Sequence, residues 1–373
     1  MTRPSHRIAD RMSQLDASGI RKVFDLAARL KDPINLSIGQ PDFDVPEAAR
    51  ERAVQAIRKG VNKYTQTQGT AELRNAIAQA CKVEFGWDDG RDYLITSGVS
   101  GALLLAMMTL VNPGDEVVFA DPYFVMYSHL INLCGGKPVP VSTYDDFRPH
   151  IERLADAITD RTRMLIINSP ANPTGAVYNQ SELRQIAELA AKRDLLVISD
   201  EIYNFFCYDE PFVSMASLYE NTLLLRGFSK SYAMTGWRIG WCTGPRGILD
   251  KMTMLQQYSF VCAPSMAQAG ALAALDLDMT AEVAAYRRKR DMVQEALGPV
   301  LGLVKPGGAF YAFPPAPGGD ATAFVTKAIQ NNVLVIPGNV FSTRNTHFRI
   351  SYATTDDKLA QGLEILVKLA KGA

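Results

Sequence analysis

The sequence has no excess of charge of either sign, because its 373 residues include 39 lysines and arginines and 39 aspartates and glutamates. Proteins that bind nucleic acid usually carry a basic excess, so this balance argues against a nucleic-acid partner. Disordered chains combine high net charge with low hydrophobicity, whereas 47% of these residues are hydrophobic. We therefore expect a folded chain with a large core.

Long apolar runs and paired cysteines are also missing. The longest uninterrupted apolar run covers residues 102–108, whereas a membrane-spanning helix needs roughly 20 residues. The N-terminal residues include no apolar stretch of the kind found in secretory signals. The five cysteines form no C-x-x-C pair, which favours reduced thiols over disulfides or a zinc site. These absences predict a cytoplasmic protein with no membrane contact and no metal.

The central part of the chain alternates between short apolar runs and helical patterns. This alternation is typical of a mostly parallel sheet with crossover helices. The seven expected strands are 93–96, 116–120, 137–141, 164–168, 195–199, 222–226 and 238–243. Expected helices include 101–110, 180–192, 248–258, 265–277, 281–297, 320–331 and 356–371.

The two ends of the chain are expected to form a second, smaller α/β unit. It would contain a helix around 19–30 and strands at 34–38, 333–336 and 347–352. We therefore predict an α/β fold with a large domain at 45–275. The small domain would be built from 1–44 and 276–373.

Polar signatures follow several expected strands, and in open α/β sheets ligands bind beyond the carboxyl ends of the strands. The run TSGVSG at 96–101 leads into a helix, whose free N–H groups and dipole favour an anion. It matches neither G-x-G-x-x-G nor the P-loop pattern, so an ordinary strand-to-helix turn is an equally open interpretation. The loop NSPANPTG at 168–175 is rigid and displays asparagines, or is simply a well-built turn.

Two ionisable residues stand at the ends of neighbouring apolar strands. Asp200 ends one of them, and a buried carboxylate there needs a cationic or hydrogen-bonding partner, unless it only caps a helix. Lys230 lies in a loop of small residues and alone would be a solvated surface charge. Eight residues later, Arg238 adds a guanidinium that can bind an anion, so the segment combines a nucleophilic amine with an anion site.

Taken in order, these segments resemble the class I/II pyridoxal-phosphate-dependent aminotransferases of fold type I, the aspartate aminotransferase-like family. The segment GFSKSYAMTGWRIG at 227–240 is similar to the family's lysine attachment site, and its MTGWR run is highly specific. The other matches are GQPD at 39–42, NPTG at 172–175, DEIY at 200–203 and FRIS at 348–351. The resemblance runs end to end and implies a large domain with a seven-stranded sheet beside a smaller α/β domain.

The resemblance implies a role for each residue around the cofactor, pyridoxal 5'-phosphate. Lys230 would form the Schiff base with the cofactor aldehyde and then move the Cα proton of the substrate. Asp200 would pair with the protonated pyridine nitrogen and maintain the ring as an electron sink. Tyr203 and Asn172 would hydrogen-bond the phenolic oxygen of the ring.

An aromatic residue that stacks on the cofactor ring is implied at Phe124, two residues after Pro122. Stacking needs a π face rather than a hydroxyl group, so phenylalanine suits this position. Tyr123 and Tyr127 are then expected to be packing residues.

The phosphate group would lie on the N–H groups of Val99 and Ser100, with Ser229 and Arg238 completing the cradle. The chain departs from the family twice in this region. Gly227 stands where a hydroxyl residue is frequent, and Ser100 where some relatives have a lysine.

Substrate and partner contacts are implied by the same resemblance. Arg349 would bind the substrate α-carboxylate, helped by the backbone of Gly39 and the amide of Asn172. Tyr64 matches the family tyrosine that reaches the phosphate of the partner subunit. A homodimer with shared active sites follows from the resemblance.

The resemblance implies a transaminase that moves an amino group from an amino acid to a 2-oxo acid such as 2-oxoglutarate, by a ping-pong mechanism. No motif supplies a cation for a second carboxylate, so aspartate, alanine and aromatic donors are all open. A C–S lyase or decarboxylase on the same fold is an alternative, because fold does not fix reaction outcome. A non-enzymatic regulator that senses the cofactor is disfavoured, because no basic DNA-binding module precedes residue 30.

Overall fold

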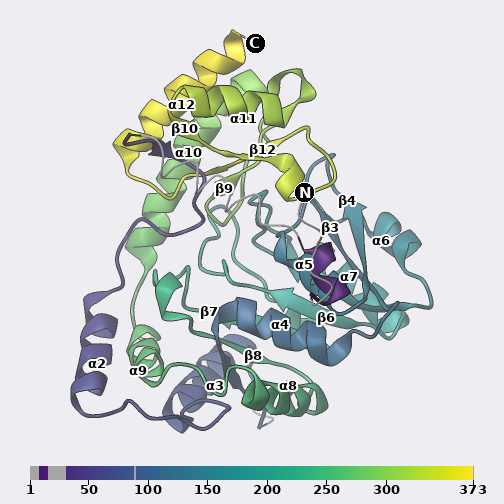
Figure 1. Ribbon diagram of the computed structural model, residues 1–373, viewed down its shortest axis with the longest axis vertical. Helices are drawn as coiled ribbons and strands as arrows, with labels where there is room; N and C mark the ends of the chain where they lie inside the picture. Colours follow the sequence, from purple (N-terminus) through teal and green to yellow (C-terminus); the bar gives the residue numbers. More distant parts are fainter. Residues whose placement is uncertain (1–7, 16–30, 88–89, 373) are drawn as a thin grey trace.

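A seven-stranded sheet forms the centre of the computed structural model, which describes residues 8–15, 31–87 and 90–372 (Figure 1). The strand order is β2-β8-β7-β6-β5-β3-β4, and β8 runs antiparallel to both of its neighbours in a sheet that is otherwise parallel. The strands are β2 (Leu94–Thr96), β3 (Glu116–Asp121), β4 (Lys137–Ser142), β5 (Thr162–Asn168), β6 (Leu196–Asp200), β7 (Thr222–Gly227) and β8 (Gly240–Thr243). The predicted α/β fold with a mostly parallel seven-stranded sheet is confirmed.

Helices cover both faces of this sheet, because its central strands are apolar on both sides. In β5, Met164 and Ile166 belong to the hydrophobic cluster that includes α4, whereas Leu165 and Ile167 pack in the cluster that includes α7. A capping box in which Asn179 and Glu182 bind each other's backbone N–H groups fixes the start of α7.

The helices fall close to the expected ranges where the sequence had indicated them. They are α2 (Glu47–Arg58), α3 (Ala71–Phe85), α4 (Gly98–Leu110), α5 (Met126–Leu133), α6 (Ile151–Ala157), α7 (Gln180–Lys192), α8 (Arg246–Tyr258), α9 (Ser265–Ala274), α10 (Thr280–Leu301), α11 (Ala321–Gln330) and α12 (Asp356–Lys371). The expected helix around 19–30 lies outside the described residues. No helix in the described part of the chain is long and apolar enough to cross a membrane.

Two small sheets form apart from the central one, and one of them joins the N-terminal segment to the C-terminal part of the chain. β1 (Ile34–Asn35) pairs in parallel with β10 (Val333–Leu334). In the other sheet, β12 (Phe348–Ser351) lies between β11 (Ile336–Pro337) and β9 (Tyr311–Ala312). Figure 1 shows α11, α12 and β12 at one end of the molecule and α2, α3 and α8 at the other. The domain boundaries at 44/45 and 275/276 stay a prediction.

The single strand expected at 333–336 was wrong. This apolar run serves two sheets, because the chain leaves the pairing with β1 after Leu334 and pairs with β12 from Ile336 onward. Every residue of the run is buried, so its hydrophobic pattern alone did not reveal the change of partner at Val335.

Candidate active site

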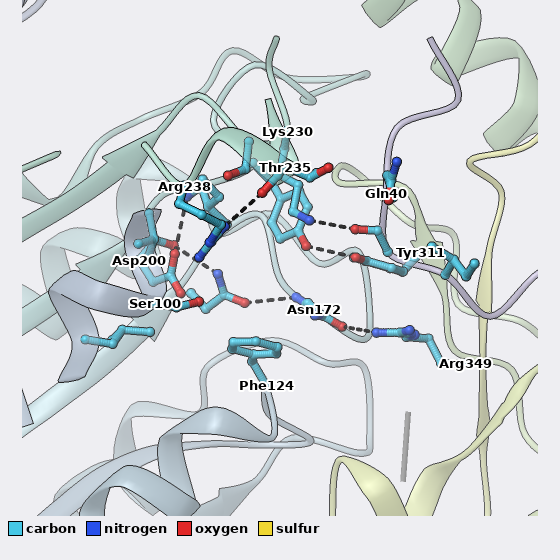
Figure 2. Close-up of a pocket in the computed structure, with 18 residues that line it drawn as sticks. Gln40, Ser100, Phe124, Asn172, Asp200, Lys230, Thr235, Arg238, Tyr311 and Arg349 are labelled. Carbon is cyan, nitrogen blue, oxygen red and sulfur yellow. Dashed lines mark hydrogen bonds between the residues drawn. The ribbon is translucent and has the colours of Figure 1, made fainter. Parts of the chain in front are cut away.

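A cavity of about 310 Å³ lies at the carboxyl ends of the parallel strands (Figure 2). As expected, the loops that follow β2, β3, β5, β6 and β7 all contribute to its wall. The described lining residues are Ile38, Gly39, Gln40, Val99, Ser100, Leu103, Phe124, Asn168, Asn172, Asp200, Ile202, Tyr203, Ser229, Lys230, Thr235, Arg238, Tyr311 and Arg349. All the site residues expected from the sequence except Tyr64 are therefore brought to one place.

Lys230 projects into this cavity from the loop after β7. Its Nζ donates a hydrogen bond of 2.6 Å to the carbonyl oxygen of Gly39. Burial, reinforced by the positive charges of Arg349 and Arg238, lowers the pKa of Lys230 to about 8. A substantial share of the amine is therefore neutral near physiological pH, as a nucleophile or base requires.

Asp200 enters the cavity from the end of β6 and is only 2% exposed. The hydroxyl of Tyr127 donates to its Oδ2 at 2.7 Å, and the N–H of Ile202 donates to its Oδ1 at 3.3 Å. Burial raises the pKa of Asp200 to about 6, although the hydrogen bond from Tyr127 opposes the rise. No described lysine or arginine forms an ion pair with this carboxylate. The interpretation of Asp200 as a helix cap is wrong, because the next helical element begins only at Met215.

Arg349 is a buried cation whose hydrogen bonds go to neutral oxygens. From β12, its Nη1 donates to Oδ1 of Asn172 at 3.0 Å and its Nη2 to the carbonyl oxygen of Ser37 at 2.7 Å. The guanidinium lies over the rings of Tyr311 and Phe341, 4.5 and 4.7 Å from their centroids. Its Nε is buried and has no partner within the described chain. The group is thus poised for an incoming anion, and a planar fork suits a carboxylate.

Tyr311 is a cavity residue that the sequence analysis missed. Its hydroxyl lies 2.9 Å from the hydroxyl of Tyr203, and both side chains are buried. A side chain at Gly39 would collide with the Tyr311 hydroxyl, so the close approach requires glycine there. Tyr311 lies within a Gly- and Pro-rich run at 305–319, but no motif in that run marks it as a cavity residue.

The N-terminus of α4 and the loop after β7 form a cradle for an anion. Gly98 has a φ of +67°, and a Cβ there would meet Nη2 of Arg238 at 2.8 Å. Val99 and Ser100 lie in the first turn of α4, so their N–H groups lack helical partners. Together with the Ser229 hydroxyl, these groups provide donors and positive charge on one side of the cavity.

Gly227, which stands where the family often has a hydroxyl residue, is closely surrounded by other side chains. A Cβ there would lie 3.0 Å from Cδ1 of Ile202 and 3.3 Å from Cγ2 of Val99, so a larger residue would need the neighbours to shift. Two other hydroxyl residues, Ser229 and Thr235, line the cavity, and Thr235 is one that the sequence analysis did not single out.

The expectation that Tyr127 only packs was incomplete. Its ring packs edge-on against Phe124, with centroids 5.7 Å apart, and Phe124 lines the cavity from below in Figure 2. The Tyr127 hydroxyl also binds Asp200, which lies 73 residues further along the chain. Only the tertiary structure reveals this contact.

Tyr64 is the one expected site residue that does not line the cavity of its own chain. It lies between α2 and α3, and 84% of its surface is exposed. Its expected contact with a partner subunit stays a prediction.

Comparison with known proteins identifies the family. The family model for aminotransferase class I and II matches residues 31–366. The chain belongs to this family. The aminotransferase is 37% identical to aromatic-amino-acid aminotransferase 2 of Thermococcus litoralis and 37% identical to the aspartate aminotransferase of Pyrococcus abyssi, with 98% of each chain covered in both comparisons. The resemblance inferred from the motifs is confirmed.

A solved structure extends the likeness to the whole fold. The aspartate aminotransferase of Thermus thermophilus with maleate matches with a TM-score of 0.91 and 35% identity, over 97% of this chain and 99% of the other. The protein is therefore an aminotransferase with the fold type I architecture, as expected.

Replacing Asp200 by Asn should stabilise the ligand-free aminotransferase at alkaline pH. Burial raises the pKa of this carboxyl from 3.8 to about 6, so the folded state loses stability as pH rises through that interval and does not regain it above. A shift of about two units corresponds to about 3 kcal/mol. In urea unfolding at pH 8, Asp200→Asn should therefore have a higher free energy of unfolding than the wild type. The difference between the two proteins should disappear near pH 4.

The exposed Asp160→Asn is the matched control and should give the same unfolding curve as the wild type at both pH values. An Asp200→Asn protein no more stable than the wild type at pH 8 would show that burial does not penalise the charged carboxylate.

Proposed function

We propose that this aminotransferase holds pyridoxal 5'-phosphate in the cavity between Lys230 and Asp200. There it moves an amino group from an L-amino acid to a 2-oxo acid, such as 2-oxoglutarate, in two half-reactions of a ping-pong cycle. The observation that carries the proposal is the presence, in one cavity, of a lysine with a lowered pKa and a buried carboxylate that forms no ion pair with any described residue. When bound, the cofactor supplies an aldehyde for the amino group and an electron-withdrawing ring.

The chemistry of the lining residues fits this cofactor. A ligand with a protonated ring nitrogen would supply the cation that the buried Asp200 lacks. The α4 N-terminus, Ser229 and Arg238 would hold its phosphate, since donors and a guanidinium gather there. Phe124 would stack on the ring face.

Tyr203 and Asn172 are the proposed donors to the phenolic oxygen of the ring. Burial raises the pKa of Tyr203 well above its usual value, so its hydroxyl keeps the proton that it donates. Oδ1 of Asn172 accepts from Arg349, which leaves the Asn172 Nδ2 group free to face the ring.

Lys230 is the proposed base. Its neutral Nζ would accept the Cα proton of the amino acid and return a proton to the substrate in the second half-reaction. The carbonyl of Gly39 orients Nζ, and the two guanidinium groups nearby favour its neutral form.

Arg349 is the proposed binding group for the α-carboxylate of either substrate. Its guanidinium is already held by contacts with the Tyr311 and Phe341 rings and by two hydrogen bonds, so little side-chain entropy is lost on binding. Because amino acids and 2-oxo acids share this carboxylate, one site serves both half-reactions.

A homodimer with shared active sites is part of the proposal. Tyr64 would reach the phosphate bound by the partner subunit. Tyr64, Tyr258 and Phe260 are aromatic residues exposed on the described chain, with exposed fractions of 84%, 83% and 36%. Exposed aromatic residues of this kind are enriched at protein interfaces.

A single half-reaction tests the proposed function. Protein loaded with pyridoxal 5'-phosphate should convert an amino donor into about one equivalent of its 2-oxo acid per chain when no acceptor is present, because the cofactor retains the amino group. Repeated turnover should begin only after 2-oxoglutarate is added. Mass spectrometry of the 2-oxo acid, with each of the twenty amino acids in turn, identifies the donor. Release of ammonia without any acceptor would contradict the proposal.

Lys230→Ala serves as the control for this experiment. It should bind the cofactor but form no 2-oxo acid, because no neutral amine takes the Cα proton. Borohydride treatment of the loaded wild type should leave the pyridoxyl group on the peptide containing Lys230. A label on a different lysine would overturn the assignment.

Mixed dimers test whether Tyr64 acts across the interface. Tyr64→Asp would place a negative charge beside the phosphate and abolish cofactor binding through like-charge repulsion. When Tyr64→Asp and Lys230→Ala chains are dissociated and reassociated together, activity should reappear, because one site of each mixed dimer has both native residues. Proven subunit exchange with no recovered activity would show that the sites are not shared through Tyr64.

A further inference from the structure

A buried tyrosine behind the cavity connects two of the residues that face it. Tyr127, in the first turn of α5, is 2% exposed and is absent from the described lining of the main cavity. Its hydroxyl donates to Oδ2 of Asp200 at 2.7 Å, and its ring meets Phe124 edge-on at an interplanar angle of 84°. Phe119 also packs against the Tyr127 ring, with ring centroids 6.1 Å apart.

We propose that Tyr127 is a positioning residue for the cofactor, because its hydroxyl keeps the Asp200 carboxylate ionised and aimed at the ring nitrogen. This inference rests on the proposed function, since it assigns Tyr127 an effect on the same bound group. Tyr127 also has a second role, because its ring packs against Phe124, the residue proposed to stack on the cofactor ring.

The other contacts of Asp200 do little to stabilise its ionised carboxylate. On Oδ1, the contact is the longer hydrogen bond from the N–H of Ile202, 3.3 Å. Among the described residues, Tyr127 is the one side chain that donates a hydrogen bond to the Asp200 carboxylate. Burial favours the neutral carboxyl, and a short hydrogen bond from a phenol opposes this by stabilising the anion.

The charged groups near Asp200 act in opposite directions. The carboxylate of Glu201 disfavours a second negative charge, whereas Lys230 across the cavity favours it. Tyr203 also faces this region, and burial keeps its hydroxyl protonated. The same holds for Tyr127, whose pKa burial and the Asp200 charge raise well above its usual value, so it remains a donor at every physiological pH.

Tyr127→Phe tests the hydrogen bond, because it retains the ring that packs on Phe124. The probe is pyridoxamine 5'-phosphate, which has no aldehyde to link to Lys230, and its analogue with carbon in place of the ring nitrogen. At pH 7.5 we expect Tyr127→Phe to bind pyridoxamine 5'-phosphate about tenfold more weakly, the usual scale for losing a hydrogen bond to a charged group. This loss of affinity should grow as pH falls toward 6. The carbon analogue should bind Tyr127→Phe and the wild type with equal affinity.

Tyr123→Phe is the matched control. Tyr123 belongs to the same segment and packs on the same Phe119 ring, with centroids 4.8 Å apart, but its hydroxyl does not contact Asp200. It should bind both ligands as the wild type does. Equal weakening of both ligands by Tyr127→Phe, or no weakening of either, would overturn the proposal.

A ligand-free measurement separates this inference from the proposed function. If the wild type bound neither ligand, the proposed function would fail. A carbon-13 NMR titration of the Asp200 carboxyl would still decide the role of Tyr127. The pKa of Asp200 should be higher in Tyr127→Phe than in the wild type, and an unchanged pKa would contradict the inference.

Discussion

The site depends on keeping two opposite charges buried in one cavity without letting them form an ion pair. Lys230 donates to the Gly39 carbonyl, and Asp200 accepts from Tyr127, so each is held by a different partner. Burial shifts both pKa values toward the neutral forms, and the charges of Arg349 and Arg238 add to the shift of Lys230. The protein therefore holds an amine ready to react and a carboxylate that a cationic ligand would stabilise.

The parallel sheet makes this separation possible. β6 and β7 are adjacent, and Asp200 ends one strand while Lys230 lies just beyond the other. Next to Asp200, Glu201 turns to the buried guanidinium of Arg226, which also binds Glu84. The positive charge of Arg226 compensates the negative charge of Glu201, and this reduces the repulsion between Glu201 and an ionised Asp200. Of these two adjacent carboxylates, Glu201 takes part in a buried ion pair, whereas Asp200 faces the cavity.

The sequence predicted the parts of the site that depend on local pattern. Apolar runs located the strands, and the motifs at their ends located Asp200, Lys230 and Arg238 because parallel strands present their carboxyl ends at one edge. It did not reveal contacts between distant segments. Tyr127 meets Asp200 across 73 residues, and Tyr203 meets Tyr311 across 108. A tyrosine in an apolar helix looks the same whether or not its hydroxyl finds a carboxylate.

The lowered pKa of Lys230 is the central claim, and a titration of this residue in the ligand-free protein tests it most directly. Trace acetylation with acetic anhydride at a series of pH values, read by mass spectrometry of the Lys230 peptide, follows the fraction of neutral amine. Exposed lysines of the same sample serve as the internal reference. Half-maximal reactivity near pH 8 would agree with burial beside Arg349 and Arg238. Half-maximal reactivity near 10.5, the ordinary value for lysine, would contradict the account.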